Sequence, residues 1–118
     1  MTDEPSRTAE LVVKRQTNPV IIRRHDAVVA STTQARLVDA GGVPVYYVPA
    51  SDVYIEHLVE VDPGSAPLGD GDARYWSVTA SGGGVEKAVW MLTKPSGDLA
   101  DLEGLMGFDP NPFNITVG

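Results

Sequence analysis

The chain contains no cysteine. Without a thiol it can form no disulfide, thiolate nucleophile, iron–sulfur cluster or cysteine-bound zinc site, so thiol-dependent enzymes are excluded. Histidine is scarce, and His25 and His57 lie too far apart to show metal-ligand spacing. No metal site is therefore expected. Aromatic residues are also few, and both tryptophans, Trp76 and Trp90, fall in one short stretch.

Long hydrophobic runs are absent too. No apolar run is long enough to cross a bilayer, and the polar N-terminus shows no signal-peptide pattern. We therefore expect a cytoplasmic protein with no membrane partner. The 118 residues suit one domain around a single core. We place this domain at residues 9–118 and expect residues 1–8 to form a flexible tail.

The net charge is −7 and is unevenly distributed. Five basic and three acidic residues precede His25, whereas four basic and thirteen acidic residues follow it. An acidic body repels phosphate backbones, so no nucleic-acid partner is expected. The pairs Lys14-Arg15 and Arg23-Arg24 are too short to form a basic patch, and a solvated N-terminal segment accounts for them.

Glycine and proline are plentiful, and they separate short apolar runs, which indicates a mainly β fold built from hairpins. We expect one hairpin over residues 20–30 with its turn at His25-Asp26, and another over residues 72–92 with its turn at 81–84. Further short strands are expected at residues 9–13, 35–39, 43–48, 53–62 and 113–117.

Two other segments complete the expected fold. One short helix near the C-terminus is predicted over residues 98–103, because acidic residues occupy its first turn and Gly104 follows it. The longest loop is expected at residues 63–71, immediately before the strand that carries Tyr75 and Trp76. Loops in such positions frequently supply binding residues.

The second hairpin carries the residues of greatest interest. Strict alternation places Trp76 on one face of its strand and Tyr75 on the other. On the partner strand, Glu86 then shares a face with Trp90, whereas Lys87 lies opposite. Glu86 can remain solvated at the mouth of the hairpin, or it can form the acidic rim of an aromatic pocket. Both interpretations stay open.

Several stretches match a known family in order and spacing. They are Tyr46-Tyr47-Val48-Pro49, Asp52-Val53, Pro67, Gly71-Asp72-Ala73-Arg74-Tyr75-Trp76, Glu86, Trp90 and residues 104–108. In these stretches the chain resembles domain-of-unknown-function family 427, and the resemblance covers residues 20–108. It implies a β-tent of two small antiparallel sheets, an architecture shared with methionine-R-sulfoxide reductases and the thalidomide-binding domain of cereblon. It implies no established activity.

The chain departs from the family pattern at two places. The family's Cys-Pro-Tyr-Lys-Gly run corresponds here to residues 66–71, which read Ala-Pro-Leu-Gly-Asp-Gly. The basic residue that often follows the family's Tyr-Phe-Pro is replaced by Ala50. The cysteine, tyrosine and lysine of the run are missing, so the resemblance supplies no cation there.

A small-ligand-binding module is the first functional hypothesis. Tyr47, Trp76 and Trp90 could converge between the two sheets, and an aromatic-lined concavity is the usual form of a small-molecule site. Carboxylates from Asp72 and Glu86 would then favour an amine-bearing ligand through cation–π contact. The expected ligand-binding residues are Tyr47, His57, Asp72, Tyr75, Trp76, Glu86 and Trp90. The alternative is that both tryptophans belong to the core.

An enzyme is a second hypothesis, with acid–base chemistry from Glu56, His57, Asp72 or Glu86. These residues form no recognised constellation, and the chain carries no nucleophile elbow or phosphate loop. Catalytic residues therefore cannot be assigned, and no cofactor is expected. A structural or protein-interaction role is the third hypothesis. The ligand and the oligomeric state stay open.

Overall fold

A computed structural model describes residues 11–40, 42–67, 71–79 and 84–118. Two expectations, the tail at residues 1–8 and the turn at residues 81–83, lie outside the described residues. Within them the chain forms ten β-strands and three short 3₁₀ helices, and no α-helix. None of the helices described is long and apolar enough to cross a membrane.

The elements follow one another along the whole described chain. The strands are β1 (Val12–Gln16), β2 (Val20–Arg24), β3 (Ala27–Thr32), β4 (Ala35–Asp39), β5 (Val45–Pro49), β6 (Leu58–Ser65), β7 (Asp72–Val78), β8 (Val85–Leu92), β9 (Leu105–Phe108) and β10 (Asn114–Val117). The 3₁₀ helices are η2 (Ala50–Asp52), η3 (Ile55–His57) and η4 (Gly97–Leu102).

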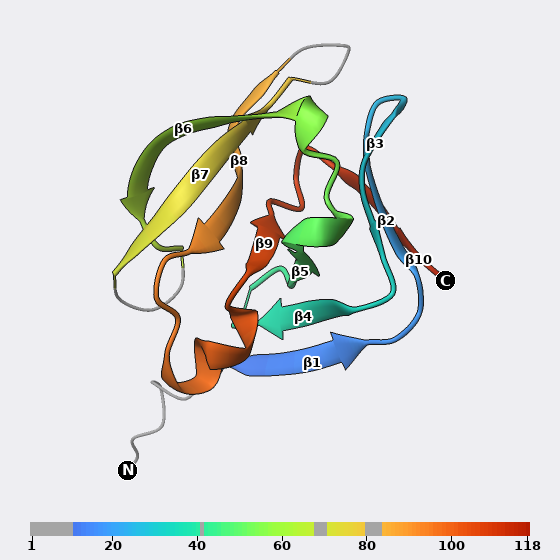
Figure 1. Ribbon diagram of the computed structural model, residues 1–118. Helices are drawn as coiled ribbons and strands as arrows, with labels where there is room; N and C mark the ends of the chain where they lie inside the picture. Colours follow the sequence, from blue (N-terminus) through green and yellow to red (C-terminus); the bar gives the residue numbers. More distant parts are fainter. Residues whose placement is uncertain (1–10, 41, 68–70, 80–83) are drawn as a thin grey trace.

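The strands form two sheets in which all paired neighbours are antiparallel. The larger has seven strands in the order β1-β4-β5-β9-β8-β7-β6, and the smaller has three in the order β10-β2-β3. Figure 1 shows β6, β7 and β8 on one side of the molecule and the smaller sheet on the other, with β5 and β9 between them. The expected mainly β fold of two antiparallel sheets is confirmed, although the sheets differ in size.

The large sheet is covered on both faces. One face packs against the small sheet, where Ile22 and Val29 meet Val48, Val89 and other buried apolar residues. The opposite face carries a second cluster around Tyr47, Trp90 and Leu102. Neighbouring residues on a strand point to opposite faces, so Tyr47 and Val48 belong to different clusters, as do Trp90 and Val89.

This two-sided burial explains the sequence of the central strands. β5, β9 and residues 88–92 of β8 read as nearly continuous apolar and aromatic runs because each of their faces has a core to enter. β6 lies at the edge of the sheet and is mostly exposed. Its mixed pattern, with no cleanly apolar face, is therefore the pattern of an edge strand.

The first expected hairpin is confirmed. β2 pairs with β3 around His25 and Asp26, and Arg24 lies opposite Ala27. His25 has a φ of +55°, a left-handed conformation that a tight two-residue turn requires. The final expected strand is also present, because β10 pairs with β2 at the edge of the small sheet.

Three expected segments differ from the structure. Residues 55–57 form η3, so the strand expected from residue 53 begins only at Leu58. The loop expected from residue 63 is also wrong at its start, because β6 continues through Pro63 to Ser65 after a bulge. Proline is tolerated there because the strand lies at an edge. The expected C-terminal helix is the 3₁₀ helix η4, without a side-chain cap at Ser96.

Candidate functional site

One row of side chains crosses the large sheet on the face turned away from the small sheet. The strand register pairs Tyr75 with Trp90, Trp90 with Gly107, and Gly107 with Tyr47. Paired residues on adjacent strands project to the same face, so the pairing brings these three aromatic rings together. Tyr47, Trp90 and Tyr75 were all expected ligand-binding residues, and the fold places them side by side.

The rings are held in fixed geometry. Trp90 donates a hydrogen bond from Nε1 to the Tyr47 hydroxyl oxygen at 2.8 Å, and the two ring centroids are 6.3 Å apart at 76°. Tyr75 lies 6.4 Å from the Trp90 ring at 52°. The Tyr75 hydroxyl donates to the Ser65 carbonyl oxygen at 2.6 Å, which fixes the outer end of the row.

Gly107 makes this arrangement possible. A Cβ atom built at Gly107 would lie 2.5 Å from Trp90 Nε1 and 2.9 Å from Tyr47 Cε2. Side-chain atoms do not approach so closely, so any larger residue would force the two rings apart. Because Gly107 has no side chain, Trp90 and Tyr47 can approach each other closely enough to form their hydrogen bond.

An apolar cavity of about 300 Å³ opens beside these rings. Its described lining comes from β4, β5, β8, the segment between β4 and β5, and the segment after β6: Val38, Ala40, Gly42, Val43, Val45, Tyr47, Pro67 and Trp90. Most of these side chains are aliphatic or aromatic. Tyr47 and Trp90 border it as almost fully buried rings whose hydroxyl and indole N–H are hydrogen-bonded to each other.

The Tyr47 phenol is kept neutral. Burial raises the pKa of Tyr47, the hydrogen bond from Trp90 partly opposes that rise, and nearby Tyr75 adds to it. The Tyr47 oxygen accepts from Trp90, and its own O–H has no acceptor among the described residues. Tyr47 borders the cavity but is 0% exposed, so its neutral phenol can donate only to a ligand that packs directly against it.

Trp76 does not join this site. It pairs with Val89 on the opposite face of the sheet and packs against the core between the two sheets. The Arg74 guanidinium lies 5.0 Å from the Trp76 ring centroid and forms a bidentate pair with Glu60 at 2.8 and 3.0 Å. The expected convergence of both tryptophans is therefore wrong, because the register pairs Trp90 with Tyr75 and Trp76 with Val89, on opposite faces.

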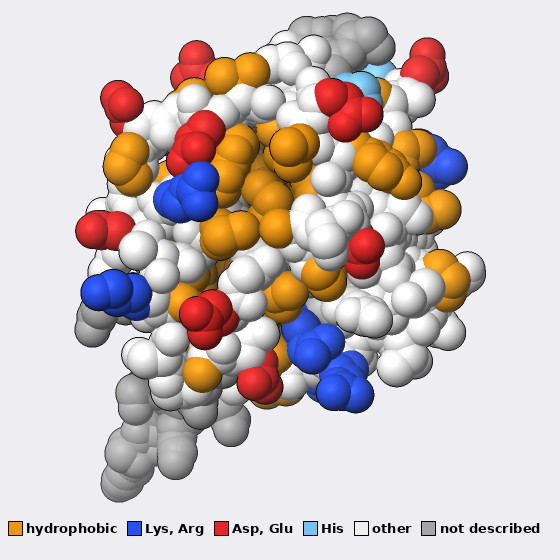
Figure 2. Space-filling model, in the orientation of Figure 1, with side chains coloured by type: hydrophobic (Ala, Val, Ile, Leu, Met, Phe, Trp, Pro, Cys, Tyr) orange, Lys and Arg blue, Asp and Glu red, His pale blue; other side chains and the backbone are white. Residues whose placement is uncertain are grey.

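Figure 2 shows the molecule in the same orientation as Figure 1. Hydrophobic side chains gather in the middle of the view, and charged side chains lie around them. The Arg74 to Glu60 pair is exposed. Its bidentate geometry lowers the pKa of Glu60, mainly through the hydrogen bonds from Arg74. The pair also holds the Arg74 guanidinium over the Trp76 ring.

The expected faces of β8 are altered by a bulge. The register shifts between Trp76 and Val78, and Lys87 adopts a φ of +53°. Lys87 then places Nζ 5.4 Å from the Tyr75 ring, on the same face as Trp90 and not opposite it. Glu86 is exposed. The group next to the aromatic row is thus a cation, where the sequence suggested a carboxylate.

The remaining expected residues lie at strand ends. Asp72 is exposed at the start of β7, opposite Ser65. His57 ends η3, and its carbonyl oxygen accepts from the Thr79 amide and hydroxyl at 2.8 and 3.2 Å. Among the described residues, no group of three or more His, Cys, Asp or Glu side chains is arranged to hold a metal ion.

Some site residues were missed from the sequence. A lone glycine inside an apolar strand, such as Gly107 between Met106 and Phe108, signals a close approach by other atoms. That signal was available and marks the closest contact of the site. Val38, Val45 and Pro67 carried no comparable signal, because only the strand order brings them next to Trp90.

The fold and the site define a small mainly β domain with an aromatic, apolar pocket on one sheet. The chain belongs to the family described as domain of unknown function (DUF427), whose model matches residues 12–117. The match extends beyond both ends of the stretch that carries the resemblance in the sequence. No curated protein matches the chain significantly.

Proposed function

We propose that this protein is a cytoplasmic small-ligand-binding module whose site is the cavity beside Tyr47 and Trp90. The observation that carries the proposal is a preformed apolar cavity bordered by Trp90 and by the buried Tyr47, whose phenol O–H has no acceptor among the described residues. Such pockets, lined by apolar side chains with a few placed polar groups, are the usual form of small-molecule sites.

The lining indicates the chemistry of the ligand. A volume of about 300 Å³ suits a compact molecule, and the aliphatic and aromatic wall favours an uncharged one. The Tyr47 hydroxyl favours a ligand that carries a carbonyl or other acceptor. The amine-bearing ligand suggested by Asp72 and Glu86 loses its support, because neither carboxylate lines the cavity. We therefore propose a neutral, compact ligand with one acceptor group.

A thermal-shift panel of small neutral amides, ketones and lactams tests the proposal. Binding to the native state raises the apparent stability by RT ln(1 + [L]/Kd), so even a weak ligand is detected at high concentration. The affinity of each hit is then measured for the Tyr47→Phe and Tyr46→Phe variants. Tyr46 lies next to Tyr47 on β5 but packs on the other face of the sheet.

Loss of one hydrogen bond weakens binding by about 2–10-fold, so Tyr47→Phe should weaken each hit by that factor. Tyr46→Phe should leave the affinity within about twofold. Equal loss in both variants, or hits that prefer amines over neutral compounds, would overturn the proposal. Among the described residues, the side chains of His57, Asp72 and Glu86 share no hydrogen bond with one another, so no observation favours the enzyme hypothesis.

A further inference from the structure

A second pocket, open to solvent, lies at the end of the β1 and β4 strand pair, and Arg15, Thr17, Thr33 and Gln34 in its lining are exposed. Its volume is about 310 Å³, and it is lined by Arg15, Gln16, Thr17, Thr33, Gln34 and Arg36. None of these residues lines the aromatic cavity. The described lining is polar throughout, contains two cations, and includes no acidic side chain.

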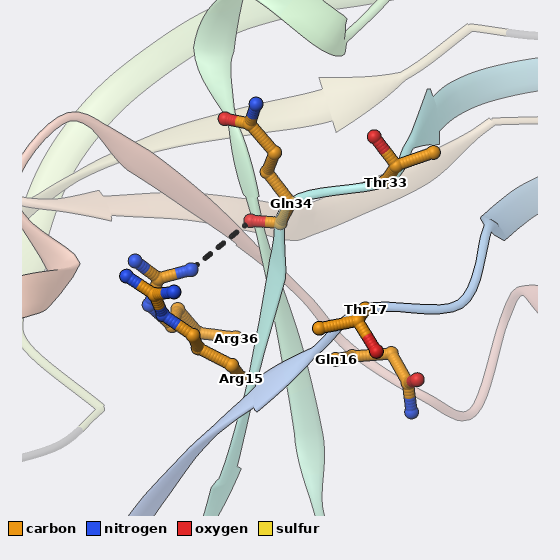
Figure 3. Close-up of a pocket in the computed structure, with 6 residues that line it drawn as sticks. All are labelled: Arg15, Gln16, Thr17, Thr33, Gln34 and Arg36. Carbon is orange, nitrogen blue, oxygen red and sulfur yellow. Dashed lines mark hydrogen bonds between the residues drawn. The ribbon is translucent and has the colours of Figure 1, made fainter.

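Arg15 and Arg36 face each other directly across the two strands. In Figure 3 both side chains extend to the same side, and their guanidinium groups lie together. Like charges directly opposite on adjacent strands destabilise a sheet. The ion pair found among the described residues joins Arg74 to Glu60. No described carboxylate is paired with Arg15 or Arg36. In the part of the chain that the structure describes, these two adjacent positive charges therefore have no carboxylate partner, although the net charge is −7.

The surrounding turns hold the pocket in place. Thr32 donates to Asp52 at 2.7 Å and accepts from the Gln34 amide at 3.0 Å, which anchors the turn between β3 and β4. On the other side, the Gln16 side-chain oxygen accepts from the Asn18 amide at 3.0 Å. Arg36 donates to the Gln34 carbonyl oxygen at 3.4 Å, which uses one donor and leaves the rest of its guanidinium available.

We infer that Arg15 and Arg36 form a binding site for the phosphate group of a small phosphorylated molecule. Each guanidinium presents a planar fork of N–H donors that matches oxyanions bidentately. A phosphate monoester offers three strong acceptor oxygens and a charge of about −1.5 to −2 at pH 7, so one group can engage both arginines and balance both charges. The Thr17 and Thr33 hydroxyls add further donors on the lining.

The two arginines and the acidic body of the protein together favour one class of oxyanion. A carboxylate has two oxygens and one charge, and it would leave one arginine unsatisfied. A nucleic acid would bring many phosphates against a body that carries thirteen acidic and four basic residues from His25 onward. A single phosphate group on a small molecule avoids both problems.

The test is an NMR titration of the folded protein with inorganic phosphate, with ionic strength held constant by chloride. We expect saturable shifts of the amides of residues 15–17 and 33–36, with a dissociation constant of about 1 mM or lower. Arg15→Gln and Arg36→Gln should each weaken binding by about tenfold, because each removes a charge-assisted bidentate contact.

Lys14→Gln is the matched control. Lys14 lies on the same strand as Arg15, and its substitution removes the same charge. It pairs with Leu37, however, and projects to the other face. It should change the affinity by less than about twofold. Absence of saturable shifts at about 10 mM phosphate, equal weakening by Lys14→Gln, or acetate binding as tightly as phosphate would overturn the inference.

Discussion

Gly107 is the position at which one residue decides the shape of the candidate site. Tyr47 and Trp90 approach from the strands on either side, and their hydrogen bond passes through the space that a side chain would fill. The buried indole N–H would otherwise have no partner, and a buried unsatisfied donor costs about 1–3 kcal/mol. The cavity wall therefore depends on the absence of a side chain as much as on the rings themselves.

Gly107→Ala should lower the free energy of unfolding by about 1–3 kcal/mol, because the new methyl group overlaps both rings. It should also weaken any ligand of the aromatic cavity. Gly64→Ala is the control, since a Cβ there meets Tyr75 at an ordinary 3.5 Å. Urea denaturation of both variants measures the difference. Equal stability of the two variants would show that the rings adjust freely around Gly107.

At the scale of the strand pair, β1 and β4 show an arrangement that costs stability. Arg15 and Arg36 oppose each other, whereas the neighbouring pairs of the two strands place no two like charges opposite each other. The sequence suggested a solvated segment around Lys14 and Arg15. Both side chains are exposed, as expected, and the segment that carries them is β1, a paired strand of the large sheet.

Arg15→Gln should therefore raise the free energy of unfolding by about 0.2–1 kcal/mol in phosphate-free buffer, since it removes the cross-strand repulsion. Lys14→Gln, on the same strand but opposite Leu37, should change it by less than about 0.5 kcal/mol. Chemical denaturation at low ionic strength measures both changes, and the gain should shrink as salt screens the charges. A loss of stability in Arg15→Gln would mean that Arg15 has a stabilising contact.

The strands also show which features of the fold could be predicted from the sequence. The hairpin at His25 and the continuous apolar runs could be predicted, because turn chemistry and burial act locally. The bulge at Lys87 could not, and it moved Lys87 onto the face of Trp90. Trp76 and Trp90 were correctly placed on one hairpin, but their opposite faces follow from a register that no local pattern fixes.

For the whole molecule, the central feature is a large sheet that buries both of its faces. One core joins the two sheets, and the other surrounds Tyr47 and Trp90. The aromatic face forms because β9 lies between β5 and β8 in the sheet. This strand order makes neighbours of residues that are far apart in the sequence. The sequence could identify the aromatic residues, but only the topology shows which of them share a pocket.

Alkaline pH should destabilise the whole fold through Tyr47. Burial raises the pKa of Tyr47 in the folded protein above its ordinary value of 10.0. As pH rises from that value toward the folded pKa, the unfolded chain loses the proton while the folded chain keeps it, so stability falls. The fall should approach about 1.4 kcal/mol per pH unit for this one group.

Denaturation curves between about pH 9 and about pH 11 measure this slope. Tyr47→Phe should flatten it, because it removes the buried phenol. An equally steep slope in Tyr47→Phe would assign the alkaline sensitivity to other groups.

The most direct test of the aromatic pocket uses the two tryptophans, which lie on opposite faces of one sheet. Their indole N–H signals can be resolved in a ¹H–¹⁵N spectrum and assigned with Trp76→Phe. A neutral ligand identified by thermal shift is then titrated into the wild-type protein. We predict that the Trp90 signal moves in proportion to saturation while the Trp76 signal stays in place. Movement of Trp76 with a stationary Trp90 would contradict the account and place the ligand on the other face of the sheet.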